Sequence, residues 1–245
     1  MALCCLAAAS QSYAVPVQLV ANGDFETGDF SAWTITDLAP GSGTFFINPN
    51  DGSPAPLSGT GGPLAVNPGG GSFFAVSDQT GPGTHALTQS LLAPLGTTSL
   101  LFSFDMFMND FSGGLNPTVD PLGLDHTGPT NQHARIDILT ATAAALSTAP
   151  ADIITSILAP VPAPAIVGGI NPWIISPVFD LTPFISAGDS FQVRFAETDN
   201  SGFLTLGVDN VSVIAGVTRA NPVPLPATLW LFSLGLAGIG WQRRR

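Results

Sequence analysis

The chain has 245 residues, of which 45% are hydrophobic and only 9% are charged, and it carries a formal net charge of −11 without a single lysine. The apolar content suffices for a buried core and argues against disorder throughout the chain. Between residues 15 and 220 three arginines face seventeen acids, a formal −14, which argues against nucleic-acid binding and makes cations the more natural partners.

The first fourteen residues, MALCCLAAASQSYA, have the composition of a secretory signal peptide. Small residues, Ser12 and Ala14, stand before Val15 at the spacing that a signal peptidase reads. The stretch is short and no basic residue precedes it, so we interpret residues 1–14 as a truncated signal peptide. The alternative is a buried N-terminal segment. Both cysteines lie in this stretch, so its removal leaves an exported chain without disulfides.

The middle of the chain shows the alternation that is typical of half-buried strands. In SLLFSFDMF (residues 99–107), Leu100, Phe102, Phe104 and Met106 share one face. Similar strands are predicted at residues 44–47, 73–77, 85–91, 134–139, 174–179, 190–196 and 203–214. The 27 glycines and 22 prolines fall between these runs as turn residues. We therefore expect one all-β domain, an antiparallel β-sandwich, over residues 15–218.

Three segments lie outside this strand pattern. Residues 48–72 and 109–132 are long loops, and loops of such length are commonly functional or mobile. The alanine- and proline-rich residues 141–169 are predicted to hold either a short helix near residues 140–146 or an irregular crossover.

Two motifs at the ends of the predicted domain indicate a fold family. LVANGDFETGDFSAW (residues 19–33) and FLTLGVDNVSVIA (residues 203–215) together resemble the galactose-binding-like jelly rolls, the fold of many carbohydrate-binding modules. The segment 177–200 is similar to the penultimate strands of that family. The resemblance implies a jelly-roll sandwich with a carbohydrate-associated or structural role.

The same resemblance implies a structural calcium ion where the two ends meet. Glu26 and Asp209 match the ligands of that family, and Asp24 and Asn22 could add oxygens. Carboxylate and carbonyl oxygens are the ligands that calcium takes. The alternative is that these acids cap backbone amides in turns, as Asp and Asn side chains commonly do.

A catalytic site would have to use the histidines. His126 and His133 lie with Asp120 and Asp125 in DPLGLDHTGPTNQH, which makes a secreted polysaccharide-acting hydrolase the alternative function. The spacing is not that of a zinc site, and there is no Gly-x-Ser-x-Gly elbow, Walker loop or cysteine nucleophile. His85 is the third histidine among the catalytic candidates. For the loop cluster, polar residues that only solvate the loop are the favoured interpretation, so we expect no enzyme.

Two tryptophans are candidates for stacking on a sugar ring. Trp33 follows the first motif at a position that the jelly-roll family buries, so we expect it in the core. Trp173 begins a predicted strand after Asn171 and Pro172, and we interpret it as an exposed ligand-binding residue.

The last residues combine an apolar run with a basic end. Residues 227–241 would form a helix of about 22 Å, shorter than the hydrocarbon core of a bilayer, which is about 30 Å thick. Residues 223–226 bring the run close to a marginal span, and Arg243, Arg244 and Arg245 would stay on the cytoplasmic side. The physical prediction is a short C-terminal hydrophobic helix that anchors an external domain in the membrane.

The sequence VPLPATLWLFSLGLAGIGWQRRR resembles the PEP-CTERM sorting signal of Gram-negative bacteria. The matching features are Pro224 and Pro226, the Leu-Trp-Leu-Phe run and the terminal arginines; Leu225 stands where that motif has Glu. We assign residues 221–245 to this signal. The resemblance implies an exosortase as processing partner, transient insertion in the inner membrane, and release to the cell surface or extracellular matrix, where the domain would be structural or bind extracellular polysaccharide.

Overall fold

The computed structural model describes residues 13–59, 62–112, 123–161 and 171–219. Most of the predicted signal peptide and all of the predicted C-terminal sorting helix therefore lie outside the described residues. Within the described part of the chain, no helix is long and apolar enough to cross a membrane.

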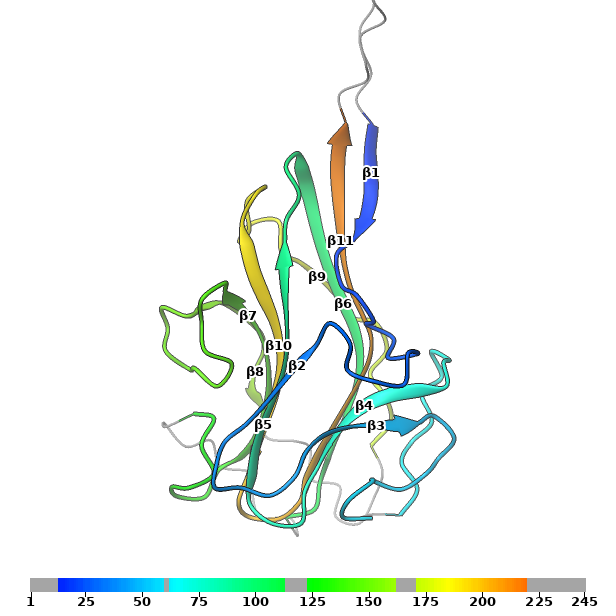
Figure 1. Cartoon of the computed structure of the whole chain (residues 1–245), viewed down its shortest axis with the longest axis vertical. Helices are drawn as coiled ribbons and strands as arrows, with labels where there is room; N and C mark the ends of the chain where they lie inside the picture. Colours follow the sequence, from blue (N-terminus) through cyan, green and yellow to red (C-terminus); the bar gives the residue numbers. More distant parts are fainter. Residues whose placement is uncertain (1–12, 60–61, 113–122, 162–170, 220–245) are drawn as a thin grey trace, which may run out of the picture.

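The described residues form two antiparallel sheets packed face to face (Figure 1). One sheet has the order β3-β4-β11-β6-β9, with β1 also paired to β11, and the other has the order β2-β5-β10-β7-β8. The strands are β1 (Tyr13–Gln18), β2 (Thr34–Asp37), β3 (Thr44–Pro49), β4 (Phe73–Asp78), β5 (Gly83–Leu92), β6 (Thr97–Asp110), β7 (Gln132–Thr140), β8 (Ile153–Val161), β9 (Val178–Asp180), β10 (Ser190–Asp199) and β11 (Leu204–Arg219). From β4 onward the chain changes sheet at every step except between β7 and β8. This is a jelly-roll sandwich, which confirms the predicted fold class.

The core between the sheets follows from strand alternation. Phe102 and Phe104 of β6 and Phe195 of β10 point inward and are almost fully buried. The ring of Phe104 meets that of Phe195 edge to face, with centroids 5.4 Å apart. Burying a side chain of this size contributes about 1.5–3 kcal/mol. The alternation predicted for residues 99–107 is therefore the one that builds the core.

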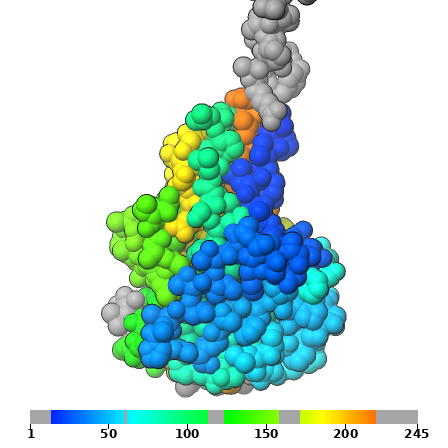
Figure 2. All heavy atoms as spheres, viewed as in Figure 1, coloured from blue at the N-terminus to red at the C-terminus, as the bar shows by residue number. Residues whose placement is uncertain are grey.

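Loops cover parts of both outer faces. The loop of residues 50–72, here called the covering loop, lies over the outer side of β4 and β6 and contributes Ala55 and Leu64 to a second apolar cluster with Phe74 and Phe107. Figure 2 shows the blue and cyan segments, from the N-terminal motif to β4, spread over the lower part of one face of the molecule. The long loop predicted at residues 48–72 thus packs against the outer face of the sheet that contains β4 and β6.

The structure differs from the strand prediction in several places. Strands β1, β2 and β8 were not predicted, because β2 has only four residues and β8 lies in the alanine- and proline-rich segment. The strand predicted at residues 174–179 is reduced to β9 and one isolated bridge at Ile174. Residues 141–152 form turns rather than a helix, and they connect β7 to β8, which pair antiparallel in one sheet. The expected helix is therefore wrong, and the described part of this segment is a hairpin connection followed by a strand rather than a crossover.

Both ends of the described chain meet at one pole of the sandwich. Strand β1 runs antiparallel to the end of β11, with Tyr13 opposite Arg219 and Gln18 opposite Ile214. In Figure 1 these two strands project together at the top, and the turns between β4 and β5 and between β10 and β11 lie at the opposite end.

Candidate functional site

The N-terminal motif packs directly against the last strand. The backbone N–H of Val211 donates to the carbonyl of Gly23 over 2.8 Å. A Cβ at Gly23 would lie 2.0 Å from the carbonyl oxygen of Val211, so only glycine permits this approach. Phe25 is fully buried beneath the motif, and Trp33 is also buried, with its Nε1 donating to the carbonyl of Asn22 over 2.9 Å. The prediction that Trp33 belongs to the core is confirmed.

Glu26 fastens the motif to the end of the covering loop. Its Oε1 accepts the backbone N–H groups of Ser72 over 2.6 Å and of Phe73 over 3.0 Å. These bonds, that from Phe73 first, lower the pKa of Glu26. Asp24 accepts the N–H of Glu26 over a longer 3.4 Å. Both acids are exposed, so water also solvates them.

Asp209 lies in a buried polar cluster on the outer face of the sheet that contains β6 and β11. It lies opposite Asp105 across β11 and β6. The Nδ2 of Asn67 donates to both carboxyl groups, over 2.8 Å to Asp209 and 3.1 Å to Asp105, and Asn210 donates to Asp105 over 2.8 Å. Burial raises the pKa of Asp209 to about 7 despite these amide bonds, and the charges of Asp105 and Glu26 add to the shift.

The predicted calcium ligands are thus brought into the same neighbourhood. Glu26 binds the end of the covering loop, and Asp209 binds the same loop through Asn67. Across residues 13–59, 62–112, 123–161 and 171–219, no group of three or more His, Cys, Asp and Glu side chains is placed to hold a metal ion. The acids accept N–H bonds, as the turn-capping alternative expects, and a calcium site at Glu26, Asp24 and Asp209 stays a prediction. Asp105 was not predicted as a member of this site, although the strand alternation at Phe104 placed it on the outer face of the sheet.

A shallow pocket of about 320 Å³ opens beside this junction. It is lined by Gln18, Val20, Asn22, Gly23, Asp24, Asn210, Val211 and Ser212. Asn22 and Asn210 both adopt a positive φ, of 48° and 49°. The Oδ1 of Asn22 is buried and has no hydrogen-bond partner among the described residues. The lining therefore offers amide, hydroxyl and carboxylate groups to a small polar ligand.

Trp173 is buried in the second apolar cluster rather than exposed. Only 8% of it is accessible, and its ring meets Phe107 and Phe74 edge to face with centroids 4.8 and 5.2 Å away. Its Nε1 donates to the carbonyl of Ala65 in the covering loop over 2.7 Å. The predicted exposure of Trp173 is wrong because the covering loop folds over this face, so the side chain presents no platform for a sugar ring.

The two histidines predicted in the second long loop are not at the surface: His126 lies in the loop, and His133 lies in β7. His126 and His133 are both buried. The ring nitrogens of His126 lie 2.6 and 3.0 Å from a backbone carbonyl and a threonine hydroxyl. Burial and the charge of Arg135 lower the pKa of His133 to about 4. Asp125 caps the turn that follows it, and Asp120 lies outside the described residues. The described part of this loop therefore presents no exposed acid–base pair.

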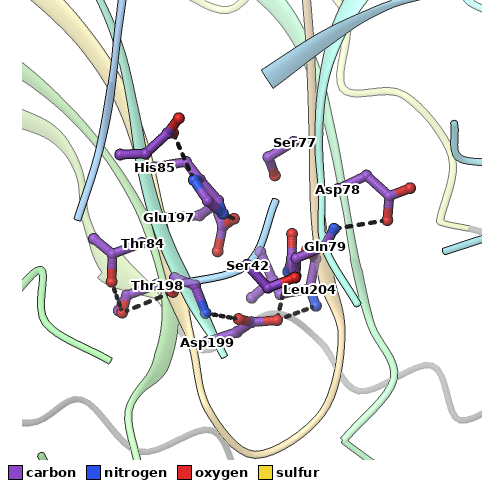
Figure 3. A network of polar contacts seen from close by, with 12 residues as sticks. Ser42, Ser77, Asp78, Gln79, Thr84, His85, Glu197, Thr198, Asp199 and Leu204 are labelled. Carbon is purple, nitrogen blue, oxygen red and sulfur yellow. Dashed lines mark hydrogen bonds and ion pairs between the residues drawn. The ribbon is translucent and has the colours of Figure 1, made fainter. Parts of the chain in front are cut away.

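A second polar cluster lies inside the sandwich, at the end opposite the chain termini (Figure 3). Strand alternation on β10 points Phe195 into the core, and it points Glu197 and Asp199 the same way. Asp199 accepts the N–H groups of Gly83 and Leu204, each over 3.0 Å, as well as the Nε2 of Gln79. One carboxyl group thus ties the β4–β5 turn to the β10–β11 turn.

Glu197 has no such partners. It is fully buried, and neither of its carboxyl oxygens has a hydrogen-bond partner among the described residues. Its Oε1 lies 3.9 Å from the Nε2 of His85, which also lacks a hydrogen-bond partner there. Figure 3 shows the two side chains next to each other, with Ser77 and Gln79 across from them. Burial, with the charge of Asp199, raises the pKa of Glu197 well above its ordinary value.

Comparison with known proteins places the tail in a family. Residues 222–245 match the PEP-CTERM protein-sorting motif. The chain is thus an all-β jelly-roll domain followed by a PEP-CTERM sorting motif, as predicted. No curated protein matches the chain.

Solved structures with a similar fold were also found. They include TmCBM61 in complex with β-1,4-galactotriose, which is 12% identical and for which the match covers 80% of this chain and 97% of that one, with a TM-score of 0.45. The K3 cleaved adhesin domain of Lys-gingipain from Porphyromonas gingivalis is 15% identical, with coverages of 80% and 99% and a TM-score of 0.45. The family 11 carbohydrate-binding module from Clostridium thermocellum is 13% identical, with coverages of 84% and 98% and a TM-score of 0.38. These values describe a distant similarity in fold.

Proposed function

We propose that this protein is exported, that an exosortase processes its C-terminal segment, and that the sandwich then serves at the cell surface or in the extracellular matrix in a structural or polysaccharide-binding role. The observation that carries the proposal is the position of the sorting motif. Strand β11 ends at Arg219, and the motif begins at residue 222. Processing near Pro224 to Pro226 would therefore remove no strand of the domain.

The N-terminal end is compatible with the same route. Cleavage after Ala14 would leave Val15 to Gln18 paired with β11, because Val15 lies opposite Val217. The apolar residues 227–241 would hold the chain in the inner membrane until processing, with the terminal arginines on the cytoplasmic side. Both removable segments would then leave from the same pole of the sandwich.

The experiment follows the full chain in a Gram-negative host that carries an exosortase. We expect the natural chain to be shortened and to reach the cell surface. We expect a chain with Arg243, Arg244 and Arg245 all changed to Ala to stay at full length in the membrane fraction. The matched control, Asp51→Asn on the exposed covering loop, should be processed normally. Identical processing of all three chains would refute the role of the arginines, and no processing of the natural chain would refute the proposal.

For the polysaccharide role, the pocket beside the N-terminal motif is the binding site that we propose. Its amide, hydroxyl and carboxylate groups are suited to bonds with sugar hydroxyls. The acidic surface would repel an acidic polymer, so we expect a neutral or cationic polysaccharide. In a glycan array probed with the full chain, Asp24→Asn combined with Ser212→Ala should weaken binding, whereas Asp51→Asn should not. Equal binding by both variants would place the ligand elsewhere, and no binding by the natural chain would leave the structural role alone.

A further inference from the structure

Burial and the surrounding acids disfavour the charge of the Glu197 carboxyl group, and they outweigh the Ser77 side chain, which favours it but lies beyond hydrogen-bond distance. The acids that act on Glu197 are Asp199 of β10, Asp37 of β2 and Asp78 of β4. Further out, Asp110 of β6 acts on Asp199, and His126 of the loop before β7 acts on His85 of β5. No titratable side chain of β11 faces this cluster in the described structure. An ionised carboxylate buried without a hydrogen bond or a cation is strongly unfavourable.

The nearest arginines cannot serve as counter-ions. Arg135 and Arg194 alternate onto the outer face of the sheet, where both bind Asp137. Glu197 occupies the inner face of the same strand as Arg194, so the sheet separates it from both guanidinium groups. This environment therefore favours the neutral, protonated form of the Glu197 carboxyl group.

His85 is oriented to interact with that proton. Its Nδ1 lies 2.7 Å from Oδ1 of Asp37, whose side chain is 41% exposed and in contact with water. An ionised Asp37 holds the ring hydrogen on Nδ1, which leaves the Nε2 that faces Glu197 as a bare acceptor. Burial lowers the pKa of His85 despite the bond to Asp37 and the nearby backbone of Ser42, and this lowered pKa favours the neutral ring. A protonated carboxyl group and a bare imidazole nitrogen are complementary.

We propose that Glu197 and His85 form a proton-binding site inside the sandwich, reached from the surface through Asp37, and that loss of the proton loosens the end of the domain formed by the β4–β5 and β10–β11 turns. Deprotonation would place a second carboxylate on the inner face of β10, two residues from Asp199. Because Asp199 holds the two turns together, repulsion between the two charges acts directly on that clamp.

The direction of the pH effect follows from linkage. A carboxyl group whose pKa is raised on folding binds its proton more tightly in the folded state, so stability is greatest at low pH and falls as pH rises toward the folded pKa. The pKa values of Asp199 and Asp209 are raised to about 7. Their contributions to stability therefore decrease as pH rises to about 7, and they stay constant at higher pH. Glu197 lacks the N–H partners of Asp199, and we expect it to ionise at higher pH. The pH dependence of stability that remains above about pH 7 therefore reports on Glu197.

The test is thermal unfolding of the full chain in mild detergent from about pH 7 to about pH 9. We expect the Tm of the natural protein to fall by several degrees and the Tm of Glu197→Gln to stay nearly constant, because the amide cannot ionise. Asp51→Asn, at an exposed acid outside the cluster, should fall with the natural protein. A constant Tm for the natural protein, or an equal fall in Glu197→Gln, would overturn the proposal.

Two measurements on the natural protein keep the proposal falsifiable if Glu197→Gln fails to fold. At about pH 8, above the pKa of Asp199 and Asp209, infrared spectroscopy should still detect a protonated carboxyl group. Its loss at higher pH should coincide with faster hydrogen exchange at the amides of Gly83 and Leu204. Nitrogen NMR should show a neutral His85 ring protonated on Nδ1. Absence of the protonated carboxyl band, or a positively charged His85 ring, would overturn the assignment.

Discussion

Asp137 and Glu197 lie on neighbouring strands of one sheet and are equally inaccessible to water, yet their environments have opposite effects. Asp137, on the outer face, accepts bonds from Arg135 over 2.7 and 2.9 Å, from Arg194 over 2.5 and 3.1 Å, and from Ser156 over 2.7 Å. Burial alone would raise its pKa, but the bond from Arg135 and the charge of Arg194 lower it. Glu197, on the inner face, has none of these partners. Partners rather than depth decide whether a buried acid is charged.

The largest expected effect comes from breaking the paired region. Asp137→Ala would leave two arginines without their shared carboxylate, and Arg194 is fully buried. Removal of one partner from a buried ion pair costs about 3–5 kcal/mol. Urea unfolding of the full chain would measure this loss, with the exposed Asp51→Asn as control. A loss under about 1 kcal/mol would show that the arginines find water or other acceptors.

An intermediate effect is expected at Asp199, which has neutral partners but no cation. Asp199→Ala would leave the N–H groups of Gly83 and Leu204 unsatisfied in the interior. Each buried unsatisfied group costs about 1–3 kcal/mol. Asp199→Asn keeps one carbonyl acceptor and should lose less in the same unfolding assay. Equal losses for both variants would indicate that the charge, rather than the acceptor geometry, matters.

A smaller effect is expected from pH alone between about 4 and 7. Burial raises the pKa of both Asp199 and Asp209 to about 7, so the folded state holds protons that the unfolded state has released. The contributions of Asp199 and Asp209 to stability should therefore decrease as pH rises through this range, whereas those of His133 and His85, whose pKa values are lowered, should increase. The difference in stability between the natural chain and Asp199→Asn isolates Asp199, and this difference should shift against the natural chain as pH rises. Asp137 has the opposite effect on stability. Its pKa is lowered, so its contribution is present at neutral pH and is lost only as pH falls through that lowered pKa. The same pH dependence of stability in the natural chain and in Asp199→Asn would contradict the raised pKa of Asp199.

The smallest effect is expected at the exposed Glu26, where water replaces lost bonds. Glu26→Gln should change the Tm only slightly if the carboxylate merely caps two amides. If Glu26, Asp24 and Asp209 hold calcium, the ion should raise the Tm of the natural chain and a chelator should lower it, with both responses weakened in Glu26→Gln. An unchanged melting temperature with calcium and with chelator would remove the metal.

Much of the fold could be predicted from sequence because strand alternation is local. The alternating run at residues 99–107 identified the core face of β6, and the turn residues separated most of the strands. Continuation of the run at residues 190–196 by two more alternate positions would have placed Glu197 and Asp199 in the interior. The contact between Glu197 and His85 could not be predicted, because only the pairing of β5 with β10 brings these two residues opposite each other.

The site was less predictable because loops decide it. Trp173 was expected at the surface, and nothing near it in the sequence indicates that Ala65 will lie over it. Asp105 faced away from the core by alternation, but its burial depends on Asn67 and Ser176 from distant segments. The N-terminal motif was more informative, since Gly23 and Phe25 have the roles that a close backbone approach and a buried anchor require.

The placement of β11 has a mechanical consequence. If the tail beyond Arg219 tethers the domain, tension enters the sandwich along β11, which is bonded to β1 on one side and to β6 on the other where it leaves the fold. A force along the axis of β11 must break its hydrogen bonds to β1 and to β6 at the same time. A force perpendicular to an edge strand would instead break the hydrogen bonds of that strand one after another. A domain tethered by this tail would therefore be loaded along a strand that is hydrogen-bonded on both sides.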